Sequence, residues 1–223
     1  TTSQAWGSDF QDSWVNIDDY YQWLKPFIAE FVRVLKDNGS MILFLDRKYT
    51  GLIVHYLERD FDLNFKNKMY FKKLNAVPSI RKVNYRSSIE ECVFLTKGKQ
   101  YTFNFGEQKD MTQVFEGPIG RKKTKHPTEK YSWMIEPLIK IHSKEGDVVL
   151  DAFAGSATTL VLAKKHNRHA IGFEKNPAMY EMAKARIEAE QLAFDFYAPD
   201  DEPAIVRELD RLMDTELADL VAA

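Results

Sequence analysis

The sequence predicts an α/β protein with a mostly parallel sheet and helices on both faces. Short apolar runs alternate with helical patterns along the chain, and the apolar run 148–150 leads into a glycine-containing loop that opens a helix at Thr158. With 223 residues, 44% of them hydrophobic, the chain can bury one sizeable core. We therefore expect one domain over residues 1–194 and a tail over residues 195–223.

The individual elements follow from hydrophobic spacing and from turn residues. A first helix is expected to begin at Asp18 or Asp19, which would cap it, and to end at Asn38 and Gly39. Residues 78–88 are expected to form a loop. Strands are predicted over residues 41–45, 68–71, 93–95, 148–150 and 170–173, and further helices over residues 51–59, 131–142, 157–166 and 176–190.

The loop after residue 150 has the features of a nucleotide-cofactor site. It reads Asp151-Ala152-Phe153-Ala154-Gly155-Ser156-Ala157-Thr158-Thr159, and Glu174 follows at the end of the next apolar run, where it would grip a ribose diol. The loop lacks the lysine of a P-loop and the three glycines of a dinucleotide site, which leaves a loop of the S-adenosylmethionine type. An ordinary strand-turn-helix corner with a surface glutamate is the alternative.

A second segment narrows the choice. The sequence Lys125-His126-Pro127-Thr128-Glu129-Lys130, placed before this strand and loop, resembles the amino-group DNA methyltransferases that modify adenine or cytosine with S-adenosylmethionine. Residues 19–24, 32–44, 77–79 and 90–99 resemble the same family, so the likeness covers most of residues 1–190. It implies a Rossmann-like methyltransferase fold in the permuted order, with the catalytic half first and a target-recognition segment over residues 105–124. It also implies a set of cofactor-binding residues: His126, Thr128, Asp151, Phe153, Gly155, Ser156, Thr158, Thr159 and Glu174.

The sequence departs from this family at two places. The family's catalytic tetrapeptide contains two adjacent prolines, and none of the eight prolines here is adjacent to another. By the family's order the tetrapeptide is expected just before Thr1, so we expect no catalytic residue within this chain, which alone would hold cofactor without transferring a methyl group. The second departure is Ala157, which replaces a glycine at a position where a positive φ would be unfavourable for alanine.

The net charge of −2 conceals a strong asymmetry. Residues 65–100 carry nine Lys or Arg against two acids, whereas residues 195–223 carry nine acids against two arginines. A basic central strip suits DNA, because neutralised phosphates supply most non-specific affinity, although a solvated lysine-rich face would look the same. The expected DNA contacts are Arg121, Lys122, Lys123 and Lys125.

Composition also limits the setting of the protein. The lone Cys92 is expected inside an apolar strand as a buried small hydrophobic residue and predicts neither a disulfide framework nor a metal site, which suggests a reducing, cytoplasmic location. The histidines show no metal-ligand spacing. No apolar run approaches the roughly 18 residues of a membrane span, so no membrane partner is expected.

These observations predict a DNA methyltransferase, as found in restriction-modification systems, acting on adenine in double-stranded DNA. Cytosine-N4 methylation and a non-catalytic cofactor- and DNA-binding module are the alternatives. The tail contains an apolar stripe after Pro203, which either packs on the core or pairs with a second copy in a homodimer. The peptide Gln191-Leu192-Ala193-Phe194-Asp195-Phe196 resembles short peptides that dock on bacterial sliding clamps.

Overall fold

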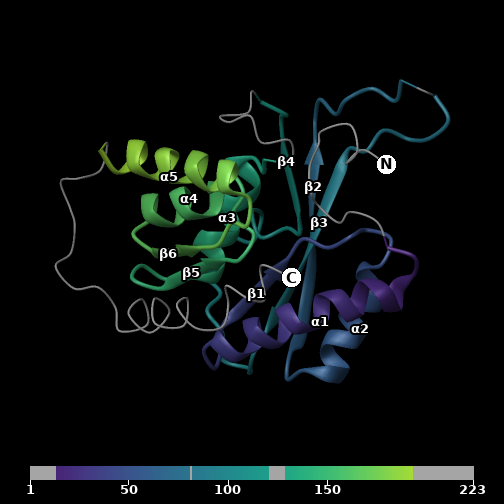
Figure 1. The fold of residues 1–223 in the computed structure, drawn as a ribbon, viewed down its shortest axis with the longest axis horizontal. Helices are drawn as coiled ribbons and strands as arrows, with labels where there is room; N and C mark the ends of the chain where they lie inside the picture. The colour runs from purple at the N-terminus through teal and green to yellow at the C-terminus, as the bar shows by residue number, and fades with distance from the viewer. Residues whose placement is uncertain (1–13, 81, 121–128, 193–223) are drawn as a thin grey trace. The chain divides into compact units, whose positions relative to one another are not determined.

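The computed structural model describes residues 14–80, 82–120 and 129–192 (Figure 1). The chain divides into two compact units, the first formed by residues 1–120 with 141–143 and the second by residues 121–140 with 144–223. The helix α3 (Ser132–His142) begins in the second unit, and its last two residues belong to the first.

The first unit is built on a four-stranded sheet in the order β1-β3-β2-β4. Its strands are β1 (Ser40–Leu43), β2 (Asn64–Lys73), β3 (Ile89–Thr96) and β4 (Val114–Gly117). The central strand β3 runs antiparallel to both neighbours, and a bulge between Phe65 and Asn67 interrupts the β2–β3 register. β2 is longer than the predicted strand 68–71, because polar residues alternate with the buried Met69 and Phe71 on an amphipathic strand.

Two helices cover this sheet and enclose the core of the first unit. Tyr20, Leu24 and Ile28 of α1 (Ile17–Val34) pack with Ile53 and Leu57 of α2 (Thr50–Asp60) and with the buried side chains of β1 and β3. The cap of α1 is Asn16, not Asp18 or Asp19 as predicted, because the Asn16 side chain accepts a hydrogen bond from the Asp19 main-chain N–H at 2.9 Å.

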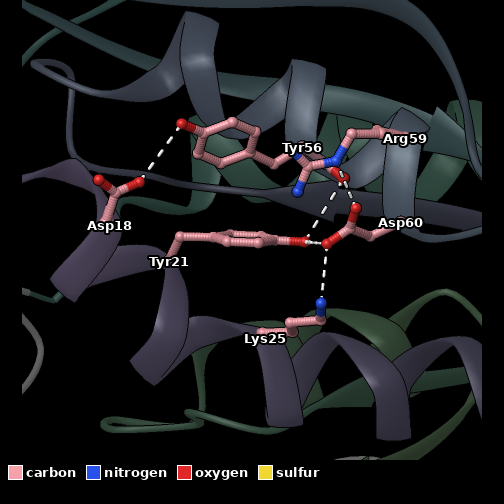
Figure 2. Close-up of polar contacts among 6 residues, drawn as sticks. All are labelled: Asp18, Tyr21, Lys25, Tyr56, Arg59 and Asp60. Carbon is pink, nitrogen blue, oxygen red and sulfur yellow. Dashed lines mark hydrogen bonds and ion pairs between the residues drawn. The ribbon is translucent and has the colours of Figure 1, made fainter.

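The side chain of Asp60 joins α1 to α2 (Figure 2). It accepts hydrogen bonds from the Tyr21 hydroxyl at 2.7 Å and the Lys25 ammonium at 2.8 Å, and it also pairs with the Arg59 guanidinium. Hydrogen bonds from Arg59, Lys25 and Tyr21 hold the pKa of Asp60 well below its usual range. Burial and the hydrogen bond to Asp60 raise the pKa of Tyr21, so the phenol stays protonated as a donor.

The strand β4 lies within the predicted target-recognition segment and was not predicted from the sequence. It pairs in parallel with β2, with Tyr70 opposite Val114 and Lys73 opposite Gly117. Parallel pairing places the carboxyl ends of both strands at the same end of the sheet. The connection between β2 and β3 therefore starts beside the chain that leaves β4.

The second unit contains the strands β5 (Val148–Asp151) and β6 (His169–Gly172), which pair in parallel. The helix α4 (Thr158–Lys165) packs on both strands, and α5 (Pro177–Leu192) lies beside α4 (Figure 1). Asn176 caps α5, since its side chain accepts hydrogen bonds from the main-chain N–H groups of Ala178 and Met179. These elements agree with the sequence prediction to within two residues at their amino-terminal ends.

The α/β fold class is confirmed, whereas the expectation of a mostly parallel sheet does not hold for the described strands. β5–β6 and β2–β4 are parallel, and the two pairs made by β3 are antiparallel. β2 and β3 are consecutive strands with no helix between them, so the chain returns along the neighbouring position in the opposite direction. None of the helices in the described ranges is long and apolar enough to cross a membrane.

Candidate functional site

The candidate cofactor site lies at the carboxyl edge of β5 and β6. Asp151 ends β5 opposite Gly172 of β6, and both strands continue into loops at this edge. Main-chain hydrogen bonds join the loops: the Phe173 N–H donates to the Asp151 carbonyl at 3.0 Å, and the Ala154 N–H donates to the Phe173 carbonyl at 2.9 Å. In α/β proteins, ligands bind in the crevice outside the carboxyl ends of such parallel strands.

Glu174 is fixed against this loop by two main-chain groups. One of its carboxylate oxygens accepts a hydrogen bond from the Gly155 N–H at 2.9 Å, and the other accepts one from the Asn176 N–H at 2.8 Å. A carboxylate offers about four acceptor positions, so this arrangement leaves acceptor capacity on both oxygens. The Glu174 side chain is thus held in one orientation while it can still receive two hydroxyl groups.

The loop turns through two left-handed residues before α4 begins. Gly155 has φ of 50°, and Ala157, the residue before the first turn of α4, has φ of 60° and ψ of 26°. Ala157 is fully buried and gives α4 no side-chain cap. The first N–H groups of α4 are therefore not satisfied by a capping side chain, and such groups favour a polar or anionic ligand.

The predicted cofactor residues in this loop have different surroundings. The Asp151 side chain accepts a hydrogen bond from the Phe153 N–H at 3.1 Å, and the Phe153 side chain is 58% exposed. Ser156 and Thr158 are buried, and their hydroxyls lie 3.3 Å apart. Their side chains thus shape the loop from within, and it is their main chain that could contact a ligand.

Two residues that were not predicted as part of the site support the loop from beneath. The Arg186 guanidinium, on α5, donates to the Ser156 carbonyl at 2.7 Å, to the Thr158 hydroxyl at 3.1 Å and to Glu129 at 3.1 Å. The Arg186 and Glu129 side chains are only 10% and 4% exposed. Glu129 could have been found from the sequence, because it directly follows the His126-Pro127-Thr128 segment. Nothing in the sequence distinguishes Arg186 from the other basic residues of its helix.

Several predicted site residues lie outside the described residues. These are His126 and Thr128 of the cofactor set and all four predicted DNA contacts, Arg121, Lys122, Lys123 and Lys125. The described part of the recognition segment is 105–120, and the tail from residue 193 onward, with most of the clamp-like peptide, is also outside. Within the described ranges, no group of three or more His, Cys, Asp or Glu side chains is placed to hold a metal ion.

Fold and site together define a class of protein. A strand-loop-helix with a left-handed turn, followed by an acidic residue after the neighbouring strand, is the arrangement of a Rossmann-like domain that binds a nucleotide-containing cofactor. The donor set fits S-adenosylmethionine: a carboxylate with spare acceptors suits its ribose, and the loop and α4 offer main-chain donors. No basic side chain of the described loop is placed to bind a pyrophosphate.

Comparison with known proteins identifies the family. A family model described as DNA methylase matches residues 2–185, and the chain belongs to this N6/N4 methyltransferase family. The chain is 29% identical over 211 residues to the type II methyltransferase M.HpaI of Haemophilus parainfluenzae, a match that covers 85% of this chain and 67% of that protein. The protein is therefore a DNA methyltransferase whose methyl donor is S-adenosylmethionine.

Solved structures agree with this assignment. The complex of M1.HpyAVI with S-adenosylmethionine superposes with a TM-score of 0.69 at 29% identity, covering 76% of this chain and 84% of that one. PvuII DNA methyltransferase, described as cytosine-N4-specific, superposes with a TM-score of 0.66 at 16% identity, covering 93% and 82%. The second likeness shows the Rossmann-like fold alone.

Proposed function

We propose that this DNA methyltransferase acts on the N6 amine of adenine, and that Glu174 is its principal ligand for the ribose of S-adenosylmethionine. The observation that carries this proposal is the pair of main-chain hydrogen bonds from Gly155 and Asn176 to the Glu174 carboxylate. They hold both oxygens at the carboxyl edge of β5 and β6 with acceptor capacity to spare. A diol presented at this edge would receive a bidentate, charge-assisted grip.

The remaining predicted residues would hold other parts of the cofactor. The exposed Phe153 ring and the Asp151 carboxylate flank the turn, and the main chain at Gly155 and at the start of α4 offers donors. His126 and Thr128 are proposed for the methionine end on the family resemblance alone. Cofactor binding by these groups sets the position of the donor methyl group.

The chemistry assigned to the family explains what the chain's residues must do. An exocyclic base amine is a poor nucleophile because its lone pair is delocalised into the ring, so the enzyme must accept the amine's hydrogen bonds and align it with the sulfonium methyl. The Pro-Pro tetrapeptide that would supply those acceptors is absent from this sequence. The role proposed for the described residues is therefore binding and orientation.

The DNA and partner contacts are proposals of the same kind. Arg121, Lys122, Lys123 and Lys125 are proposed to contact phosphates, in a cytoplasmic enzyme whose lone cysteine, Cys92, is buried in β3. A homodimer through the tail and clamp docking through residues 191–196 are further proposals that rest on sequence alone.

Calorimetric titration with S-adenosylmethionine tests the cofactor site. Removing a carboxylate that accepts two hydroxyls should cost about 1.5–3 kcal/mol, so Glu174→Ala should bind roughly 10- to 150-fold more weakly while the chain still folds. Glu188→Ala, which removes an exposed acid from α5, should bind like the wild type. Equal affinities for the two variants would contradict the assignment of Glu174.

The target base is tested separately, on DNA from cells that express the complete gene. Mass spectrometry of hydrolysed DNA should show N6-methyladenine. N4-methylcytosine without N6-methyladenine would contradict the assignment of adenine and identify cytosine as the target base. Unmodified DNA would favour a non-catalytic module.

A further inference from the structure

The connection between β2 and β3, residues 74–88, exposes an unusual amount of apolar surface. Tyr85 is 96% exposed, Ile80 88% and Val83 82%, and Leu74 and Val77 on the same connection are also mostly exposed. Isolated exposed apolar residues need no explanation, but several on one short segment mark an interaction surface. In Figure 1 this connection extends well beyond the ends of β2 and β3.

Three hydrogen bonds stabilise the conformation of this connection. The Lys73 N–H donates to the Ser88 carbonyl at 2.8 Å, which closes the base. The Arg86 guanidinium donates to the carbonyl of the buried Ala76 at 3.4 Å, and the Lys82 N–H donates to the Ser79 carbonyl at 3.2 Å.

The positive charge of the connection indicates a negatively charged partner. Residues 74–88 contain Arg81, Lys82 and Arg86 and no acidic residue. An apolar and aromatic tip with only positive charge suits duplex DNA, because cations contact phosphates while apolar side chains wedge against base steps or stack on bases.

The position of the connection supports the same partner. The Leu74 N–H donates to the Gly117 carbonyl at 3.0 Å, and the Asn75 amide donates to the Ile119 carbonyl at 3.0 Å while it accepts from the Ile119 N–H. The connection is thus tied to the end of β4, where the proposed recognition segment runs on in sequence to Arg121, Lys122 and Lys123.

We propose that the described part of this connection, residues 74–80 and 82–88, forms a second DNA-contacting arm, in which Ile80, Val83 and Tyr85 press against the bases of a duplex and Lys82 contacts its phosphates. This inference rests on the proposed function and adds to it a set of contacts that do not depend on charge. Apolar contacts release no counterions, so their loss should leave the salt dependence of binding unchanged.

The test measures the affinity of the whole chain for a short labelled DNA duplex by fluorescence anisotropy at several salt concentrations. The double variant Ile80→Ser, Tyr85→Ser should bind roughly tenfold more weakly with the same slope of log K against log salt. Lys82→Gln should lower that slope by about one unit. Tyr85→Phe should bind like the wild type, because a stacking ring needs no hydroxyl. Leu52→Ser, at an exposed apolar position of α2, is the matched control.

Two results would overturn the inference. The first is a double variant that binds DNA as tightly as the Leu52→Ser control. The second is a wild type that elutes as a dimer in size-exclusion chromatography and a double variant that elutes as a monomer with unchanged DNA affinity, which would assign the surface to a second copy of the chain. A wild type without measurable DNA affinity would contradict the proposed function as well, and titration with S-adenosylmethionine on the same samples would show whether the cofactor site survives.

Discussion

Arg186 and Glu129 lie 57 residues apart in the chain and form an ion pair of 3.1 Å with both side chains almost completely buried. The same guanidinium nitrogen donates to the Ser156 carbonyl and the Thr158 hydroxyl, inside the proposed cofactor loop. The Arg186 Nε is buried and has no hydrogen-bond partner among the residues that the structure describes. The pair therefore couples α5 and the segment before α3 to the turn that opens α4.

Variants that break the Arg186–Glu129 ion pair should show whether it contributes to the free energy of unfolding, to cofactor affinity or to both. Removing one partner of a buried ion pair typically costs about 3–5 kcal/mol, so Glu129→Met and Arg186→Met should each lower the free energy of unfolding, measured in urea. The double variant should be less destabilised than the sum of the two, because it leaves no unpaired buried charge. Lys184→Met, at an exposed position of α5, is the control.

In the same variants, the affinity for S-adenosylmethionine should depend on Arg186 and should not recover in the double variant. The hydrogen bond from Arg186 to the Ser156 carbonyl is lost in Arg186→Met and in the double variant, so both should bind S-adenosylmethionine more weakly, by about tenfold for a charge-assisted hydrogen bond. If the double variant regains both stability and full affinity, Arg186 supports the fold alone and does not position the loop.

The left-handed Ala157 provides a second prediction. A left-handed conformation costs a residue with a Cβ about 1–2 kcal/mol, and Ala157→Gly would relieve this cost while it gives up a buried methyl group worth about 1 kcal/mol. The substitution should therefore change the free energy of unfolding by less than about 1 kcal/mol. Ala157→Val should destabilise by more than about 3 kcal/mol, because a branched side chain at φ of 60° finds no space in a fully buried position. Equal stabilities of the Gly and Val variants would contradict this account.

His142 provides a pH prediction. Its ring lies between Phe94 and Phe103, with centroids 4.2 and 5.4 Å away, and burial lowers its pKa to about 4. In the unfolded chain His142 binds a proton near pH 6.5, the ordinary pKa of histidine, whereas in the folded chain it binds one only near pH 4. The stability contributed by neutral His142 is complete above pH 6.5 and is lost as the pH falls through this window, by roughly 3 kcal/mol in total.

The measurement is the free energy of unfolding in urea from pH 7 to pH 4. The wild type should lose more stability than His142→Phe across this range, and the difference between the two curves isolates this histidine from the carboxylates. His55→Phe, at an exposed histidine of α2, serves as the control. Parallel curves for the wild type and His142→Phe would remove His142 as the cause.

The parts of the fold that could be predicted from the sequence are those encoded locally. Asn176 and Pro177 marked the start of α5, and the run from Val148 through Thr158 marked a strand, a loop and a helix, all of which the structure contains. The position of Glu174 just after β6 could be predicted because its distance from Asp151 is a property of a strand-loop-helix-strand unit, whereas its role as a ribose ligand remains a proposal. The structure adds the orientation of its carboxylate.

The parts that could not be predicted depend on long-range pairing. β4 has only four residues, and its partner β2 lies more than 40 residues earlier, so neither length nor periodicity distinguished it from a loop. The contacts of Arg186 with Ser156 and Thr158 depend on how α5 packs beside α4, which no local pattern encodes. The antiparallel position of β3 likewise depends on the return of the chain after residue 88.

The anchoring of Ile119 to Asn75 has a practical consequence for chimeric enzymes. Residues 114–119 behave as part of the scaffold, because β4 pairs with β2 and the Asn75 side chain hydrogen-bonds to the main chain of Ile119. A foreign recognition segment spliced in before β4 would have to rebuild an edge strand, whereas one joined after Gly120 would inherit a ready attachment point. An exchange that replaces only the residues after Ile119 should therefore disturb the sheet least, whereas an exchange of the whole proposed recognition segment, residues 105–124, would have to supply a matching β4.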